Sequence, residues 1–177
     1  MNRKKFYTAV VLFLLAALYV TIFCFSAEDA ESSSAISGKI TQMILDLYYR
    51  IVGVPEITGG GLAGDGFSLE GLIRKLAHFA EYMCMGFLSY SLVTVWNRPR
   101  LRGSALVVLQ VFLSAALDEF HQYFVPGRNA SFRDVLIDTA GGIAGILVIL
   151  AWMGVRKGWQ HFRNFRNNSE KKKRTDS

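Results

Sequence analysis

Six ionisable side chains stand inside otherwise apolar runs between residues 75 and 145. They are His78, Glu81, Asp118, Glu119, Asp134 and Asp138. A charge near the centre of a bilayer costs about 2.5 kcal/mol or more, so ionisable residues in a membrane-spanning segment indicate a functional site. Carboxylates beside an imidazole could perform general acid–base chemistry. The candidate catalytic residues are His78, Asp118, Glu119 and Asp134.

The same residue types suit two other chemistries and one structural role. Lys75 and Arg128 could engage a phosphate or carboxylate of a lipid-linked or peptide ligand. A divalent cation could take its donors from Asp118, Glu119, His121 and Asp134. The spacing of these donors matches no metal signature, so we expect neither a metal nor another cofactor. In the structural alternative, the charges only pair with one another and hold the helices in register.

These residues lie in or beside four apolar segments. Each segment is long enough to cross the hydrocarbon core of a membrane, which takes a helix of roughly 20 residues. Backbone polar groups in lipid must be bonded internally, so each segment is predicted to be a helix. The segments are Phe6–Ser26, Leu76–Trp96, Ser104–Phe124 and Phe132–Val155. The sequence therefore predicts an all-α integral membrane protein with about four transmembrane helices. The membrane domain would cover residues 1–155, with a basic cytoplasmic tail at 156–177.

Basic residues are concentrated on one side of the predicted spans. The N-terminus, the loop after residue 96 and the tail hold most of the 20 lysines and arginines, whereas the loop at residues 27–73 is acidic. The positive-inside rule then predicts a multi-pass protein of the cell membrane with both termini in the cytoplasm. Topology accounts for the net charge of +6, so the expected partner is the lipid bilayer and not nucleic acid. The first apolar run is longer than the core of a signal peptide, which favours an uncleaved anchor.

The predicted external loop, residues 27–73, contains its own helical pattern. Apolar residues recur at helical spacing at Ile36, Ile40, Met43, Ile44, Leu47 and Ile51. This spacing predicts an additional amphipathic external helix. Such a helix could lie on the outer leaflet or cover the external ends of the spans.

Depth along the helices places the polar residues in one layer. At 1.5 Å per residue, His78 and Glu81 lie roughly 6 and 10 Å below the external surface, and Asp118 and Glu119 lie roughly 8–9 Å below it. Asp134 and Asp138 lie roughly 3 and 9 Å below the same surface. Three spans therefore supply ionisable groups to one shallow external layer, close to the lipid surface where a lipid-linked or cell-wall ligand would be met.

Helical faces and turn signals support this layer. Gln110, Ser114, Asp118 and Gln122 form a ridge on one face of the third span. Gly141-x-x-x-Gly145 shares a face with Asp134 and Asp138 and is typical of closely packed membrane helices. Pro126-Gly127 predicts a turn, and Ser131 predicts the N-cap of the last span. The predicted ligand-binding residues are Lys75, His78, Tyr82, Asp118, Glu119, Gln122, Arg128, Ser131, Asp134 and Asp138.

The combined motif resembles the VanZ-like family. It consists of Arg74-Lys75-x-x-His78-Phe79-x-x-Tyr82, then Asp118-Glu119-x-x-Gln122-x-Phe124-x-Pro126-Gly127-Arg128, then Ser131-x-x-Asp134-x-x-x-Asp138-x-x-Gly141. The resemblance covers the chain to about residue 155, and Asp138 departs from the asparagine expected at that position. It implies a bacterial envelope protein of four or five membrane helices. The named member of the family is associated with low-level resistance to the glycopeptide teicoplanin.

The sequence thus leads to one expected function and two alternatives. We expect an envelope membrane protein whose external polar site binds or modifies a surface or lipid-linked ligand and lowers teicoplanin susceptibility. The first alternative is a membrane-embedded acid–base or metal-dependent hydrolase or transferase. The second is a structural or assembly protein in which the charges form a network only.

Overall fold

The computed structural model describes residues 2–28, 35, 38–43, 46–47, 50–51, 69–97 and 100–175. Its long helices are α1 (Arg3–Ala27), α3 (Leu69–Val95), α4 (Arg100–Gln122) and α5 (Phe132–Thr175). No residue in these ranges is in a β-strand. The prediction of an all-α protein is therefore confirmed.

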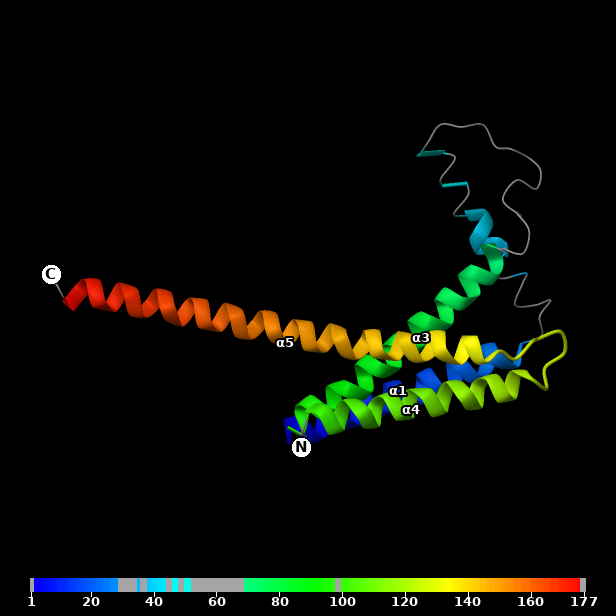
Figure 1. The fold of residues 1–177 in the computed structure, drawn as a ribbon, viewed down its shortest axis with the longest axis horizontal. Helices are drawn as coiled ribbons and strands as arrows, with labels where there is room; N and C mark the ends of the chain where they lie inside the picture. The colour runs from blue at the N-terminus through cyan, green and yellow to red at the C-terminus, as the bar shows by residue number, and fades with distance from the viewer. Residues whose placement is uncertain are drawn as a thin grey trace.

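The four helices form a bundle in which α3 is the shared element. It packs against α1, α4 and α5, and its contact with α5 is the most extensive in the bundle. Helices α1 and α4 run in the same direction, whereas α3 and α5 return toward the end of the bundle where the chain begins (Figure 1). The turn between α3 and α4 contacts the first turns of α1 through a hydrogen bond of 3.1 Å that Trp96 Nε1 donates to Thr8 Oγ1.

Three helical segments are long and apolar enough to cross a membrane: Arg3–Ala27, Arg100–Gln122 and Phe132–Asn164. Their surfaces carry exposed large apolar side chains such as Phe13, Leu117 and Leu147, which lipid accommodates better than water. The chain is therefore an all-α membrane protein. Helix α3, predicted as the second span, is not among the three, although its 27 residues reach about 40 Å. Its polar residues lower its hydropathy, and its crossing of the membrane stays a prediction.

Helix α5 continues far beyond its predicted end at Val155. It has 44 residues and a length of about 66 Å, against about 30 Å for a hydrocarbon core. No proline follows residue 126, and the lysine, arginine and glutamate of the tail favour helix. The helix consequently has no stop signal at residue 155, and its C-terminal part extends away from the bundle (Figure 1).

The predicted amphipathic external helix falls partly outside the described residues. Within them, residues 38–43, 46–47 and 50–51 are helical. The apolar side chains of Ile40, Met43, Leu47 and Ile51 are exposed, whereas Ile36 and Ile44 lie outside the described residues. The apolar stripe is therefore uncovered where it is described, and its position on a leaflet stays a prediction.

The connection between α4 and α5 is built as its sequence predicts. The Arg128 N–H donates to the Val125 carbonyl at 3.2 Å, and Gly127 has a φ of 74°. Proline followed by a residue of positive φ is typical of a type II turn. Ser131 then caps α5, since its Oγ accepts a hydrogen bond of 3.2 Å from the Arg133 N–H.

Glycines allow α3 and α5 to approach until their backbones touch. A Cβ atom added at Gly145 would fall on the Met83 carbonyl group, and one added at Gly86 would fall on that of Gly142. Gly141 faces the Phe79 carbonyl in the same way. The predicted Gly141-x-x-x-Gly145 contact is therefore present, and its partner helix is α3. Small residues commonly allow such close crossings in membranes.

We expect Gly145→Ala to destabilise the bundle, because the new methyl group overlaps backbone that cannot move as a side chain does. Overpacking of this kind costs about 1–3 kcal/mol. The matched control is Gly154→Ala in the same helix, where no atom lies within 4 Å of the added Cβ. Thermal unfolding of both variants in detergent measures the difference. Equal melting temperatures would contradict the assigned contact.

Candidate functional site

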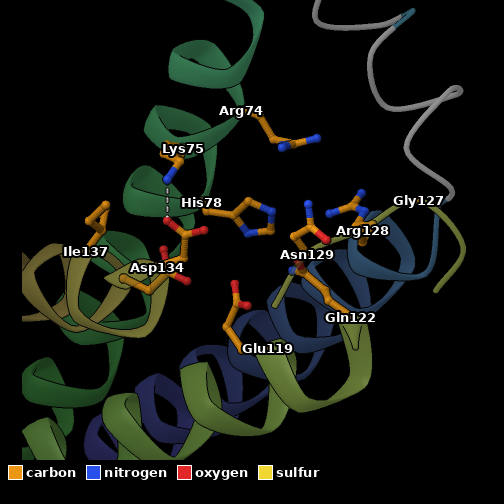
Figure 2. A pocket seen from close by; sticks show the side chains of 11 residues that line it. Arg74, Lys75, His78, Glu119, Gln122, Gly127, Arg128, Asn129, Asp134 and Ile137 are labelled. Atoms are coloured by element: carbon orange, nitrogen blue, oxygen red, sulfur yellow. Dashed lines mark hydrogen bonds and ion pairs between the residues drawn. The ribbon is translucent and has the colours of Figure 1, made fainter. Parts of the chain in front are cut away.

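A pocket of about 110 Å³ opens where α3, α5 and the end of α4 meet the turn at residues 123–131. Seven of the ten predicted ligand-binding residues line it: Lys75, His78, Glu119, Gln122, Arg128, Asp134 and Asp138. Figure 2 labels all of these side chains except Asp138, and the labelled ones converge from three helices and the turn. They meet at one end of the bundle because α3 and α5 both begin there, and α4, which runs in the opposite direction, ends there (Figure 1).

The other three predicted residues lie beside the pocket. Tyr82 is almost fully buried, and Asp118 is 8% exposed. The Ser131 N–H donates to Glu119 Oε2 at 2.8 Å. These residues support the site and do not line its opening.

Four further lining residues were not among the predicted ligand-binding residues: Arg74, Gly127, Asn129 and Ile137. Gly127 and Asn129 belong to the Pro126-Gly127 turn, which was predicted as a connection only. Arg74 directly precedes Lys75 in the sequence. This adjacency was the signal that could have placed Arg74 in the predicted ligand-binding set. Successive helical residues point about 100° apart, so the sequence did not reveal that both reach one pocket.

A first group of residues in this layer holds the helices together. Lys75 Nζ lies 2.5 Å from Asp134 Oδ1 and joins α3 to α5. The two side chains are 44% and 24% exposed, so we expect the pair to contribute no more than about 1 kcal/mol to stability. Its main effect is to hold the ends of the two helices in one register.

The polar ridge of α4 faces α1. Gln122 Nε2 donates to Ser26 Oγ at 3.2 Å and to Asp118 Oδ2 at 3.1 Å. Lower in the bundle, the Tyr19 hydroxyl is bonded to Ser114 Oγ at 2.8 Å and accepts from the Gln110 amide at 3.1 Å. The ridge was predicted from spacing, whereas its partners on α1 were not.

Arg128 ties the turn to the C-terminal end of α1. Its Nη2 donates to the Phe25 carbonyl at 2.8 Å and its Nε donates to the Glu28 carbonyl at 3.0 Å. Carbonyl groups at a helix end have no partner inside the helix and attract cations. Burial lowers the pKa of Arg128, and the positive charge of Arg74 lowers it further. The guanidinium nevertheless remains charged, since its ordinary pKa lies above 12.

The side chains of a second group of residues make no hydrogen bond to any described residue. Asp138 is 3% exposed and makes no hydrogen bond or ion pair with any described residue. The Nδ1 atom of His78 is buried without a hydrogen bond, and its ion-pair contact is with Glu81 Oε2 at 3.5 Å. Arg74, at the rim of the pocket (Figure 2), bonds to none of the described residues. We call Arg74, His78 and Asp138 the open groups.

The four predicted metal donors are not brought together. Glu119 is held by Ser131 and Asp134 by Lys75. The His121 ring stacks on Phe23 with centroids 4.8 Å apart, and this contact directs it toward α1. Of the four, only Asp118 belongs to the group of potential ligands that the described residues form.

The fold and the site together define an all-α membrane protein with a shallow polar pocket at one end of its bundle. The family model VanZ/LLP1 matches residues 10–153. This chain therefore belongs to the VanZ/LLP1 family. The match includes every residue of the pocket and stops before the exposed C-terminal part of α5. No curated protein and no solved structure matches the chain.

We expect Arg128→Lys to destabilise the protein although the charge is kept. Lysine has one ammonium group and cannot bond two separate carbonyls with the planar geometry of arginine. Loss of a hydrogen bond to a charged group costs about 1.5–3 kcal/mol. The control is Arg133→Lys, because Arg133 is exposed on the same side of the bundle. Thermal unfolding in detergent compares them, and equal stabilities would contradict the proposed role of Arg128.

Proposed function

We propose that this protein acts at the cell envelope, where its pocket binds the anionic headgroup of a lipid-linked or cell-wall molecule. The observation that carries the proposal is the rim of the pocket. There the guanidinium of Arg74 has no partner among the described residues, and that of Arg128 is bonded to carbonyl groups and to no carboxylate. Guanidinium groups recognise phosphate and carboxylate with paired hydrogen bonds.

The size of the pocket limits the ligand to one small group. A volume of about 110 Å³ suits a small group such as one phosphate or carboxylate. A whole glycopeptide is far too large. The proposed ligand therefore enters with its headgroup, and the rest of it lies outside the pocket.

We infer further that α3 is a fourth span and that both termini are cytoplasmic. Helix α3 is surrounded by α1, α4 and α5, so neighbouring helices can accommodate its polar residues. The ends of the bundle opposite the pocket carry basic residues, among them Arg3, Arg100 and Arg156. The positive-inside rule places that end in the cytoplasm and the pocket outside.

This topology predicts which introduced cysteines can be labelled. In a background with Cys24→Ala and Cys84→Ala, a membrane-impermeant maleimide added to intact cells should label Ala130→Cys beside the pocket. It should not label Lys157→Cys until the cells are opened. Labelling of Lys157→Cys alone in intact cells would reverse the orientation and would contradict an external pocket.

The structural alternative accounts for only part of the layer. The Lys75–Asp134 pair, Gln122 and Arg128 all join helices, as a structural network requires. A buried carboxylate without a partner is costly, however, and Asp138 does not contribute to such a network. The open groups favour a ligand site over a charge network only.

We propose that headgroup binding lowers teicoplanin susceptibility, as resemblance to the VanZ-like family implies. Expression in a teicoplanin-susceptible Gram-positive host should then raise the inhibitory concentration. Arg74→Gln should abolish this increase without reducing membrane accumulation, because Arg74 bonds to none of the described residues. The control is Arg133→Gln, which removes the same charge on the same side but outside the pocket.

Two results would contradict the proposal. If Arg74→Gln accumulates normally and protects as well as the wild type does, the rim has no role. If both arginine variants lose protection equally, the surface charge matters and the pocket does not. Membrane accumulation is measured by immunoblot in every strain, so that loss of protein is not read as loss of function.

A further inference from the structure

We propose that His78, Asp118 and Asp138 form a binding site for a divalent transition-metal ion of the Zn²⁺ class. One potential ligand atom from each residue lies within 4.8 Å of the other two. The residues come from α3, α4 and α5, so the site would join three helices at the floor of the pocket. The inference goes beyond headgroup binding and does not depend on it.

The bonding of these side chains supports a missing cation. Asp138 is 3% exposed and has no partner among the described residues. Asp118 is similarly buried, and the one hydrogen bond to its carboxylate comes from the neutral amide of Gln122. The buried Nδ1 of His78 neither accepts nor donates a hydrogen bond. Buried charged groups are normally paired or coordinated to a metal. Within the described chain, the ion pairing of the three side chains is limited to the 3.5 Å contact of His78 with Glu81.

The charge around the cluster also favours a cation. Lys75 and Asp134 neutralise each other. Glu81 and Glu119 lie near the cluster and add to the charge of its two aspartates, against Arg74 and Arg128 at the rim. The floor of the pocket is therefore acidic and its mouth is basic.

The donor set indicates the class of ion. One imidazole with two carboxylates and no thiolate suits Zn²⁺ or a similar first-row ion better than Mg²⁺ or Ca²⁺, which prefer oxygen alone. Zinc bonds these donors at about 2.0–2.2 Å, which places tetrahedral ligand atoms about 3.4 Å apart. Rotation of the three side chains would have to close the remaining gap. Three protein ligands also leave a fourth position open.

The backbone contact of α3 with α5 explains why the donors meet. A Cβ atom added at Gly141 would fall on the Phe79 carbonyl. Gly141 lies three residues after Asp138, and Phe79 follows His78. With no side chain between the two helices at this point, the imidazole and the carboxylate lie within reach of each other. The Lys75–Asp134 pair, one turn away on both helices, keeps the same register.

Metal binding by purified protein tests the site. The full chain is prepared in detergent without a polyhistidine tag, stripped with a chelator and dialysed against Zn²⁺, and its metal content is measured by mass spectrometry. We expect about one tightly bound ion per chain and a higher melting temperature with the ion, because a ligand of the folded state stabilises it. His78→Gln and Asp138→Asn should each weaken binding by roughly 100-fold or more, since even outer-shell partners contribute about 10- to 100-fold.

The controls separate this site from other donors. His121→Gln and the exposed tail variant His161→Gln should bind Zn²⁺ as the wild type does. Without metal, Asp138→Asn should melt no lower than the stripped wild type, because it removes an unpaired buried carboxylate. The metal site is rejected if the wild type binds no stoichiometric Zn²⁺, or if His78→Gln and Asp138→Asn both retain full affinity.

A measurement on the wild type alone covers the case in which these variants do not fold. X-ray absorption of the Zn²⁺-loaded protein should show one imidazole and otherwise oxygen ligands. Sulfur in the coordination shell, or more than one imidazole, would overturn the assignment. Headgroup binding is assayed separately by the Arg74→Gln phenotype, so failure of either proposal is recognised independently.

Discussion

Direct backbone contact between α3 and α5, at Gly86, Gly142 and Gly145, sets the geometry on which the pocket depends. A Cβ at Gly86 or Gly145 would overlap backbone of the facing helix, and the two helices would have to separate. The same crossing brings Lys75 beside Asp134 at the end of the helices. Helix α4 packs on α3 and α5. It is joined to α1 through hydrogen bonds. A packing constraint in the apolar part of the bundle therefore positions the polar layer.

The polar layer has two parts with different consequences. Residues that join helices, such as Gln122 and Arg128, have partners, and their contribution is positional. The side chains of the open groups, Arg74, His78 and Asp138, make no hydrogen bond within the described chain, and His78 has a 3.5 Å contact with Glu81. In a low-dielectric setting an unsatisfied polar group is costly, so open groups beside a pocket are more informative about function than the paired ones. They combine a basic rim with an acidic floor, which suits an anionic headgroup above a bound cation.

Much of this arrangement could be predicted from the sequence, because it depends on local patterns. Apolar length predicts the helices, rise per residue predicts the common layer, and Pro126-Gly127 predicts the turn. What could not be predicted depends on how helices rotate against one another. His121 was a plausible donor until its ring proved to stack on Phe23, and the group of His78, Asp118 and Asp138 has no motif because its members are 20 or more residues apart. The length of α5 was underestimated because hydropathy, and not a helix stop, defined its predicted end.

The function that we propose for this protein requires that its pocket hold the headgroup of a lipid-linked anion. Native mass spectrometry of the protein released gently from its own membranes tests it most directly. We expect a bound lipid-linked phosphate or carboxylate species on the wild type and on Arg133→Gln, and its loss from Arg74→Gln. Identical spectra for the three proteins, with only bulk phospholipid attached, would contradict it.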